Sequence, residues 1–371
     1  MVLKCVQCGS EFASYPPKSS CSKCGGTLDY KINLSKIGRI KFSGQLRFWR
    51  YRPLLPPVQH IISLGEGGTP LHKADRLAGS MGLKELYLKD ETRNPTNSYR
   101  DRAAALLTSN AIDLRHGMLI CATNGNLGAS IAAYSAKAGL TCHVIVPKIV
   151  DVGKLAQMLA YDAIIEESGE ILDDSIRKAE ALAKETGWYQ ATSELNPLAI
   201  EAQKTISYEV YEQFRVPEWF IVSMGSGGTI YSIWKGFKEL KQLGMTDSLP
   251  KMVGVQPEGC ASIVKTLAEG HAKLAKILNP STHALAVLVA RPLQGELALK
   301  ALKESKGLAL TVSDSEIFAA ELEIAKLEGM FAEPASSATI AVLRKLAEKG
   351  KISNNDSVVG LITGSGLKAT D

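Results

Sequence analysis

From about residue 85 onward, short apolar runs alternate with longer Ala-rich stretches, and this alternation limits the fold more than any other feature of the sequence. The short runs are rich in β-branched residues and are expected to be strands, at 118–122, 141–146, 219–223, 251–255 and 357–362. The longer stretches have helical spacing, at 101–111, 127–138, 171–185, 229–243 and 316–327. Strands that alternate with helices form βαβ units, so we expect an α/β fold with mostly parallel sheets.

Length and composition agree with a globular α/β protein of more than one domain. The 371 residues suit two or three domains, and 45% apolar and 22% charged residues are ordinary values for a soluble protein. No apolar run approaches the roughly 18 residues that a membrane helix needs, and the first ten residues lack the apolar core of a signal peptide. We therefore expect a cytoplasmic protein without a membrane partner.

Positive charge is concentrated in residues 31–60, which contain no Asp or Glu. The basic residues of this segment are Lys31, Lys36, Arg39, Lys41, Arg47, Arg50 and Arg52. Such a segment can contact nucleic acid or an acidic partner, or its side chains can pair with carboxylates elsewhere in the fold. We favour the second interpretation and call residues 31–60 the basic connector.

Four cysteines form two CxxC pairs, Cys5 with Cys8 and Cys21 with Cys24. Each pair can present two sulfurs to one metal ion, and four thiolates make a closed tetrahedral set, which is typical of a structural zinc site. Iron could take the place of zinc, whereas disulfides are disfavoured in a chain without an export signal. We expect residues 1–30 to be a zinc ribbon that depends on its metal to fold.

A glycine-rich loop follows the strand expected at 219–223 and precedes a helix. Its ligand-binding candidates are Gly225, Ser226, Gly227, Gly228 and Thr229. Backbone N–H groups in such a loop can converge on an anion, and the helix start adds a favourable partial charge. The loop is neither a P-loop nor a good dinucleotide fingerprint, so we expect a phosphate without a whole nucleotide. A tight turn without a ligand is the alternative.

Two more loops follow strands in the same way. The first loop offers hydroxyl, amide and backbone donors at a helix start, from Thr123, Asn124, Gly125 and Asn126. These donors suit a carboxylate and a hydrogen bond to a ring oxygen. The alternative is that they only cap the helix. Near the C-terminus, Thr363 can present its hydroxyl to a ligand or belong to a simple turn. Ligands in open α/β sheets bind at such strand ends, so these loops are candidates for one site.

Ten segments, taken together and in order, resemble the threonine synthase family. They are the ribbon cysteines with 49–52, then 65–71, 89–102, 124–126, 153–157, 196–205, 225–229, 333–338 and 363–368. Each segment alone is modest evidence for the family, but the ordered set extends through most of the chain.

The resemblance implies a two-domain fold with pyridoxal phosphate (PLP) in the cleft between the domains, in addition to the zinc ribbon. The large domain would contain residues 31–98 and 192–371, and the small domain residues 99–191. The family converts O-phosphohomoserine to threonine, so a small phosphorylated ligand or amino acid is the expected partner. Because members of the family commonly form dimers, the resemblance also suggests a homodimer.

The resemblance also assigns roles to the loop residues. Residues 225–229 would hold the PLP phosphate, Asn126 the ring hydroxyl and Thr363 the pyridine nitrogen. Thr123, Asn124 and Gly125 would face the substrate carboxylate. Lys154 is a candidate cation for a substrate phosphate, or else a solvated residue at a helix start.

One position departs from the family pattern in a way that matters for catalysis. The family reads Asn-Pro-Thr-Gly-Ser-Phe-Lys-Asp-Arg where residues 94–102 read Asn-Pro-Thr-Asn-Ser-Tyr-Arg-Asp-Arg, so Arg100 stands at the position of the lysine that forms the Schiff base with PLP. A guanidinium remains charged at physiological pH and lacks the free amine that this reaction needs. Arg100 can instead bind a carboxylate or phosphate with its planar fork. Asn97, Leu127 and Asp162 are further departures.

Three functions are therefore open. The favoured one is a threonine synthase-like protein that binds PLP or another phosphorylated ligand without a covalent bond and lacks ordinary lysine-dependent turnover. The second is a functional PLP lyase, with Lys89, Lys204 or Lys368 as a relocated lysine, or such an enzyme inactivated by a Lys-to-Arg mutation. The third is a binding or regulatory protein that uses the ribbon and the basic connector.

Overall fold

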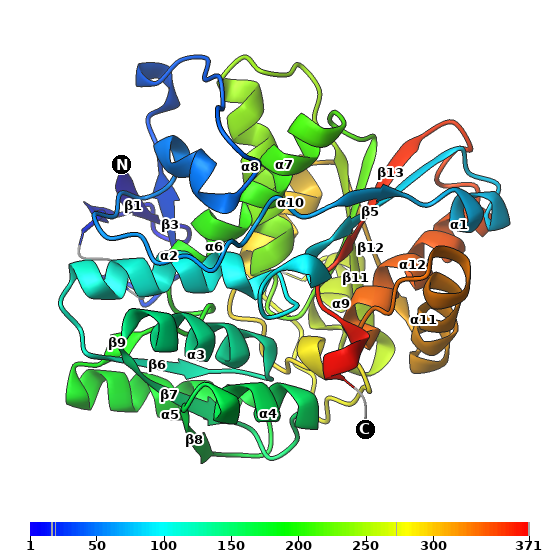
Figure 1. Ribbon diagram of the computed structural model, residues 1–371. Coiled ribbons are helices and arrows are strands. Elements are labelled where there is room, and N and C mark those ends of the chain that lie inside the picture. The colour runs from blue at the N-terminus through cyan, green and yellow to red at the C-terminus, as the bar shows by residue number, and fades with distance from the viewer. Residues whose placement is uncertain (16–17, 19, 272, 370–371) are drawn as a thin grey trace.

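The computed structural model describes residues 1–371 except 16–17, 19, 272 and 370–371. The chain forms a six-stranded sheet, a four-stranded sheet and a small three-stranded sheet near the N-terminus (Figure 1). In the described part of the two larger sheets, every strand pair is parallel except β4 with β5. The predicted α/β class with mostly parallel sheets is confirmed.

The strands of the larger sheets fall close to the predicted ranges. The six-stranded sheet has the order β12-β11-β10-β13-β5-β4 and consists of β4 (Leu71–Lys73), β5 (Glu85–Asp90), β10 (Trp219–Ser223), β11 (Lys251–Pro257), β12 (Leu308–Val312) and β13 (Ser357–Ile362). The four-stranded sheet has the order β8-β7-β6-β9 and consists of β6 (Met118–Ala122), β7 (Thr141–Val146), β8 (Ile164–Glu167) and β9 (Tyr189–Gln190). Strands β6, β7, β10 and β13 have the predicted bounds, and β11 continues to Pro257.

Both faces of the six-stranded sheet are buried by helices, which explains why its strands are continuously apolar. Successive side chains of β10 point to opposite faces: Phe220 packs in one hydrophobic cluster and Ile221 in the other. The helices of the first cluster are α6 (Leu198–Gln203), α7 (Thr205–Gln213), α8 (Gly228–Gln242), α9 (Ser262–Glu269) and α10 (Gly295–Glu304). Those of the second are α1 (Asp75–Ser80), α11 (Asp314–Glu328) and α12 (Pro334–Glu348).

The four-stranded sheet is covered in the same way by helices on its two faces. One face packs against α2 (Arg100–Asp113), α3 (Asn126–Ala138) and α4 (Val152–Ala160), and the other against α5 (Leu172–Thr186). Helix α2 is buried along nearly its whole length because it lies between α3 and α6. Its first residue, Arg100, is partly exposed and marks the end that faces the cleft described below.

Short 3₁₀ helices occupy several of the connections. They are η1 (Leu34–Lys36), η2 (Phe48–Leu54), η3 (Glu91–Arg93), η4 (Glu258–Cys260), η5 (Leu285–Val287) and η6 (Gly366–Lys368). None of the helices in the described residues is long and apolar enough to cross a membrane. The two larger sheets lie in the two predicted domains, but the domain boundaries themselves stay a prediction.

The N-terminal sheet is antiparallel, with the order β2-β1-β3, and is docked on the rest of the chain. Its strands are β1 (Val2–Cys5), β2 (Glu11–Ala13) and β3 (Leu28–Lys31). Asp29 of β3 is buried, lies 2.7 Å from the ammonium of Lys235 on α8, and accepts a 2.7 Å hydrogen bond from Tyr231. Residues 16–17 and 19 of the predicted ribbon lie outside the described residues.

The basic connector pairs only in part with carboxylates. Lys31 contacts Asp29 at 2.5 Å and Arg50 contacts Glu212 at 2.8 Å. Lys36, Arg39 and Lys41 are exposed and form no ion pair within the described part of the chain. Two of the seven basic residues therefore pair with carboxylates among the described residues, as the favoured interpretation expects, and a nucleic-acid partner stays untested.

Candidate active site

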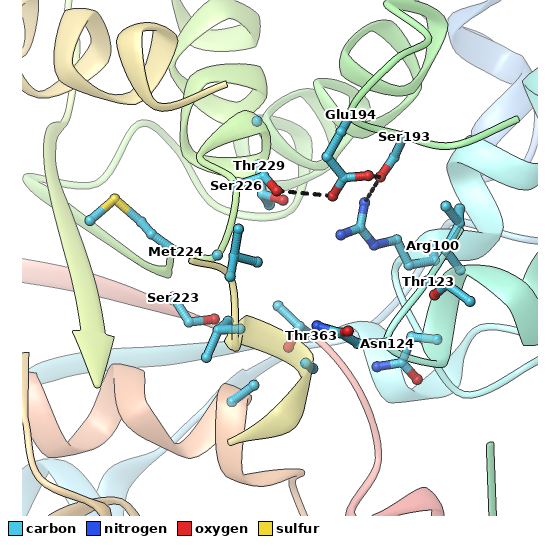
Figure 2. A pocket seen from close by; sticks show the side chains of 18 of the residues that line it. Arg100, Thr123, Asn124, Ser193, Glu194, Ser223, Met224, Ser226, Thr229 and Thr363 are labelled. Atoms are coloured by element: carbon cyan, nitrogen blue, oxygen red, sulfur yellow. Dashed lines mark hydrogen bonds between the residues drawn. The ribbon is translucent and has the colours of Figure 1, made fainter. Parts of the chain in front are cut away.

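Three loops at the carboxyl ends of parallel strands meet the start of α2 and form a cleft (Figure 2). Its lining includes Thr123–Asn126 after β6, Gly225–Thr229 after β10, Thr363 after β13, and Arg100. Of the residues predicted to bind cofactor or substrate, all but Lys154 line this cleft. The loops meet because the carboxyl ends of parallel strands lie at the same edge of each sheet.

The glycine-rich loop is shaped to present its backbone to a ligand. Gly227 has φ +98°, and a Cβ there would lie 2.8 Å from the carbonyl oxygen of Gln294, so only glycine fits. The N–H groups of Gly225, Ser226 and Gly227 donate to no described acceptor. They stand at the start of α8, where the helix dipole favours an anion.

Asn126 carries a buried acceptor without a partner. Its Oδ1 is inaccessible to solvent and accepts no hydrogen bond among the described residues, while its Nδ2 donates to both oxygens of Glu333, at 3.2 and 2.8 Å. A buried amide oxygen left in this state costs free energy, so a ligand hydroxyl at this point would relieve that cost.

Thr363 lies beside the same carboxylate. Its hydroxyl donates to Glu333 Oε1 at 3.1 Å and lies 2.7 Å from the hydroxyl of Ser336. Burial alone would raise the pKa of Glu333, but the ammonium of Lys154 and the amide of Asn126 hold it below its ordinary value. Glu333 is therefore an anion at neutral pH that orients both Asn126 and Thr363.

The loop after β6 is held by its own hydrogen bonds. The hydroxyl of Thr123 accepts from the N–H of Gly125 at 2.9 Å, and the amide of Asn124 donates to the carbonyls of Leu285 and Leu288, at 2.9 and 3.1 Å. The side-chain donors of Asn124 are thus already engaged. A ligand carboxylate at this loop would have to use its backbone and the hydroxyl of Thr123.

Lys154 lies behind this loop and not in the cleft. Its side chain is 1% exposed, its Nζ is 2.5 Å from Asp151 and 3.2 Å from Glu333, and its stem packs on Gly125. The alternative of a solvated lysine is wrong because the surrounding loops bury it. Its contact with a substrate phosphate stays a prediction, and in the structure its charge is balanced by two carboxylates.

Arg100 points into the cleft from the start of α2. Its Nη1 donates to the hydroxyl of Ser193 at 2.9 Å, and its guanidinium lies 4.8 Å from the ring centre of Tyr99 (Figure 2). Within the described residues no Asp or Glu lies close enough to Arg100 to form an ion pair, and no lysine lines the cleft. Arg100 is therefore the cation of the cleft.

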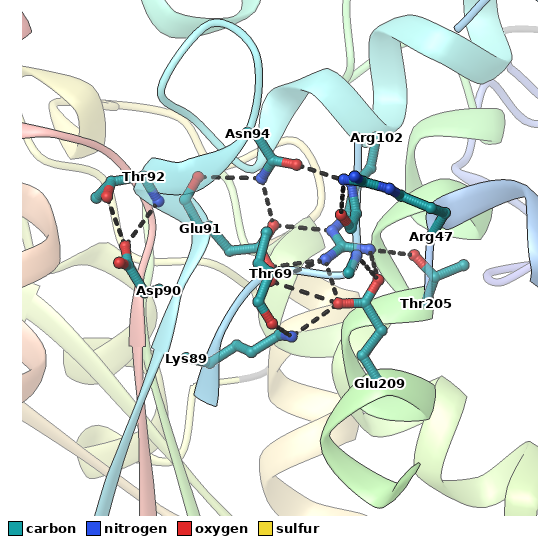
Figure 3. Close-up of polar contacts among 12 residues, drawn as sticks. Arg47, Thr69, Lys89, Asp90, Glu91, Thr92, Asn94, Arg102, Thr205 and Glu209 are labelled. Atoms are coloured by element: carbon teal, nitrogen blue, oxygen red, sulfur yellow. Dashed lines mark hydrogen bonds and ion pairs between the residues drawn. The ribbon is translucent and has the colours of Figure 1, made fainter. Parts of the chain in front are cut away.

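Arg102, two residues further on, has a different environment (Figure 3). It is fully buried and pairs with Glu91 at 2.8 Å and with Glu209 at 2.6 Å. Asn97, in the preceding loop, has φ +60°, a left-handed backbone that Asn tolerates better than other non-glycine residues. The loop that leads into α2 is thus intact, and Arg100 is correctly placed at its end.

The three lysines considered as replacements are all buried outside the cleft. Lys89 contacts Glu209 at 2.7 Å, and Lys204 contacts Glu201 at 2.7 Å, which confirms the alternative that they are ion-pair lysines. Lys368 donates to the carbonyl of Thr96 at 2.6 Å, and burial lowers its pKa to about 8. In this arrangement none of the three reaches the cleft.

Sequence reasoning missed several residues of the cleft. Glu333, Ser193, Glu194 and Gln294 line it, and the two hydroxyls of Ser193 and Ser226 donate to Glu194, at 2.9 and 3.1 Å. Glu333 was visible only as part of a family-like segment before a helix. Glu194 and Gln294 lie in connections without a motif, so no local signal could have found them.

The four ribbon cysteines are gathered at one point. Their sulfur atoms all lie within 4.8 Å of one another, with 3.5 Å between Cys5 and Cys24 and 3.6 Å between Cys8 and Cys21. The N–H groups of Cys8 and Lys23 point at the sulfurs of Cys5 and Cys21. Four such thiols can hold one tetrahedral metal ion.

The residues of the cleft fit PLP. Unpaired N–H groups at a helix start suit its phosphate, the unpartnered Oδ1 of Asn126 suits its ring hydroxyl, and the hydroxyl of Thr363 suits a neutral pyridine nitrogen. Among the lining residues that the structure describes there is no lysine for the usual covalent link, since Arg100 occupies the end of the loop.

Comparison with known proteins identifies the family of the chain. The family described as pyridoxal-phosphate dependent enzyme matches residues 62–364. The threonine synthase of Methanosarcina acetivorans is 41% identical over 99% of this chain and 92% of its own, and that of Methanocaldococcus jannaschii is 39% identical over 100% and 94%.

A solved structure shares the fold at lower identity. Threonine deaminase isoform 2 from Solanum lycopersicum, in its processed form, superposes with a TM-score of 0.67 over 80% of this chain and 83% of that chain, at 23% identity. The family match and the long alignments with threonine synthases point to the same family, and the solved structure shows the same fold. The chain therefore belongs to the threonine synthase family of pyridoxal-phosphate-dependent enzymes.

Proposed function

We propose that the cleft binds PLP together with a phosphorylated amino acid of the O-phosphohomoserine type, the substrate class of threonine synthases. The observation that carries the proposal is the set of unsatisfied groups around one cavity. The N–H groups of Gly225–Gly227 and the Oδ1 of Asn126 have no partner among the described residues, and the hydroxyl of Thr363 is beside them. Relatives named threonine synthase at 37–41% identity support the same function.

Each group of the cleft has a role in this proposal. PLP, when bound, supplies the electron sink for carbanion chemistry on amino acids. The glycine-rich loop would bind its phosphate, Asn126 would accept from its ring hydroxyl, and the hydroxyl of Thr363 would turn its one proton from Glu333 to the ring nitrogen. Glu333 orients the amide of Asn126 and lies beside the hydroxyl of Thr363, so it positions two of the groups that would hold the ring.

Turnover is the point on which two forms of the proposal differ. The names of the relatives favour a working lyase that releases phosphate and forms threonine. Arg100 favours a second candidate, a cleft that binds both ligands but lacks ordinary lysine-dependent turnover, because the described cleft has no lysine. General acid–base help from a lysine is typically worth about 10²–10⁴ in rate, so the two forms are far apart experimentally.

Phosphate release from O-phosphohomoserine, measured with the wild type and Arg100→Lys in saturating PLP, tests both forms. If the cleft is intact and lacks only its lysine, Arg100→Lys should exceed the wild type at least about a hundredfold. Equal and substantial rates in the wild type and Arg100→Lys would show a working lyase whose catalysis depends on residues other than a lysine at position 100. No release by either protein, together with no PLP binding, would refute the proposed function.

We also propose that Cys5, Cys8, Cys21 and Cys24 hold a structural zinc ion. The gathered sulfurs support this, and four thiolates leave no open position for catalysis. The metal content of freshly purified protein, measured by mass spectrometry, should be about one zinc per chain. Protein without any bound metal would refute the assignment.

A further inference from the structure

Arg100 differs from the other large cations around the cleft because it lacks a carboxylate partner. Arg102, Lys154 and Lys204 each contact carboxylates at 2.5–3.2 Å. Arg100 appears in no ion pair of the described residues, although it is only partly exposed. A guanidinium that is held at a cleft without a carboxylate in direct contact can accept an anionic group.

The guanidinium is held in place, and one side of it remains available. Nη1 donates to Ser193, whose hydroxyl donates in turn to Glu194 at 2.9 Å. The other oxygen of Glu194 accepts from Ser226 at 3.1 Å, so this carboxylate is engaged on both sides and is kept off Arg100. Nε and Nη2 donate to no acceptor in the described chain, and Figure 2 shows the group directed into the cavity.

The chemistry of the two neighbouring loops indicates which kind of anion this site receives. The phosphate donors are on the glycine-rich loop, next to Thr229, while the side chain of Arg100 begins beside Thr123 and its guanidinium extends toward Ser193 and Glu194 (Figure 2). The loop at Thr123 has no charged side chain of its own, and the amide donors of Asn124 are already engaged. A carboxylate at this loop would therefore need the charge that Arg100 supplies.

We infer that Arg100 binds the carboxylate of the amino-acid ligand through Nε and Nη2, in concert with the loop Thr123–Gly125. This rests on the proposed function for the identity of the ligand as a phosphorylated amino acid. The planar fork of an arginine matches the two oxygens of a carboxylate, which an ammonium cannot do. The residue at the lysine position thus selects ligands that have both a carboxylate and a phosphate.

Two probes that differ only in the carboxylate test this inference. 4-Phosphooxybutanoate has the skeleton of O-phosphohomoserine without the amine, so it cannot react with PLP, and propyl phosphate lacks the carboxylate as well. Calorimetric titration of the PLP-saturated wild type should show about ten- to a hundredfold tighter binding of 4-phosphooxybutanoate, the usual range for a hydrogen-bonded charge pair.

The variant Arg100→Met should lose this preference and keep its affinity for propyl phosphate within about threefold. Arg215→Met, which removes an exposed arginine that pairs with Glu85 far from the cleft, is the matched control and should behave as the wild type. If Arg100→Met does not fold, as judged by its thermal melt, Arg100→Gln replaces it. Equal affinities of the wild type for both probes, or a preference that survives in the folded variant, would overturn the inference.

PLP binding is recorded in the same samples, so the two claims can fail separately. Protein that retains PLP but shows no preference refutes the role of Arg100 alone. Protein that binds no PLP refutes the proposed function, and the preference measured without PLP then decides the role of Arg100.

Discussion

The guanidinium of Arg100 donates a 2.9 Å hydrogen bond to the hydroxyl of Ser193, and this contact holds a positive charge in the cleft. It fixes a permanent cation at the position where the family resemblance places a lysine. The surrounding groups for phosphate, ring hydroxyl and pyridine nitrogen are all present. In the proposed function the cleft therefore binds PLP and its ligand as a threonine synthase cleft would, with an arginine at one point where a lysine is expected.

Gly227→Ala should weaken PLP binding about ten- to a hundredfold, because it disturbs several donors to the phosphate. The residue has φ +98°, and a Cβ would lie 2.8 Å from a backbone oxygen of Gln294, so the loop must move. PLP fluorescence titration measures the change. Gly117→Ala is the control, since Gly117 has no positive φ and no atom within 4 Å of its Cβ position. Unchanged PLP affinity in Gly227→Ala would contradict the phosphate site.

Glu209→Gln should reduce the free energy of unfolding by about 3–5 kcal/mol, the usual cost of breaking a buried ion pair. Glu209 is fully buried and neutralises both Arg102 and Lys89, so the variant leaves two buried cations with Glu91 alone (Figure 3). Urea unfolding at pH 7 measures it. The exposed pair variant Glu180→Gln should change stability by less than about 1 kcal/mol. Similar losses of unfolding free energy in both variants would show that the buried ion pairs stabilise the fold no more than the exposed pair does.

The same residue predicts a dependence of stability on pH. Burial alone would raise the pKa of Glu209, but Arg102 and Lys89 hold it well below its ordinary value. A depressed pKa in the folded state gives a stabilisation that is complete above the unfolded pKa of about 4.3 and is lost as the pH falls below it. Urea unfolding between pH 7 and 3 should therefore show a shallower decline for Glu209→Gln than for the wild type. Parallel curves would contradict this account.

The zinc assignment predicts a difference between cysteines. Cys24→Ser should remove the bound metal and expose residues 1–30 to protease, because a unit of this size depends on its metal. Cys142→Ser, a buried cysteine of β7, should keep the metal. Metal analysis and limited proteolysis of both variants measure whether each one keeps its metal and its protease resistance. Full metal content in Cys24→Ser would show that the four sulfurs do not act as one site.

Sequence reasoning found the parts of this protein whose signals are local. Strands such as β6 and β10 are short continuous apolar runs, and the glycine-rich loop and Asn126 follow them directly, so their fold and placement could be predicted. The resemblance added the order of these parts. It also exposed Arg100, since the departure is visible only against the family pattern.

The rest depends on contacts between distant segments. Lys154 has the sequence context of an exposed helix start, and only the packing of Gly125 and Glu333 on it explains why it is buried. Glu194 reaches the cleft from a connection without a motif and is fixed by Ser226, 32 residues away. Such contacts follow from tertiary packing, which no short window of sequence contains.

The central claim is that the cleft binds PLP without a covalent link to the protein, because Arg100 stands where the lysine would be. Borohydride reduction of the PLP-loaded protein, followed by peptide mass analysis, tests it most directly. The wild type should retain PLP through dialysis yet show no pyridoxyl group on any peptide, whereas Arg100→Lys should gain one on residue 100. A pyridoxyl group on a lysine of the wild type, or no PLP retained by either protein, would contradict the claim.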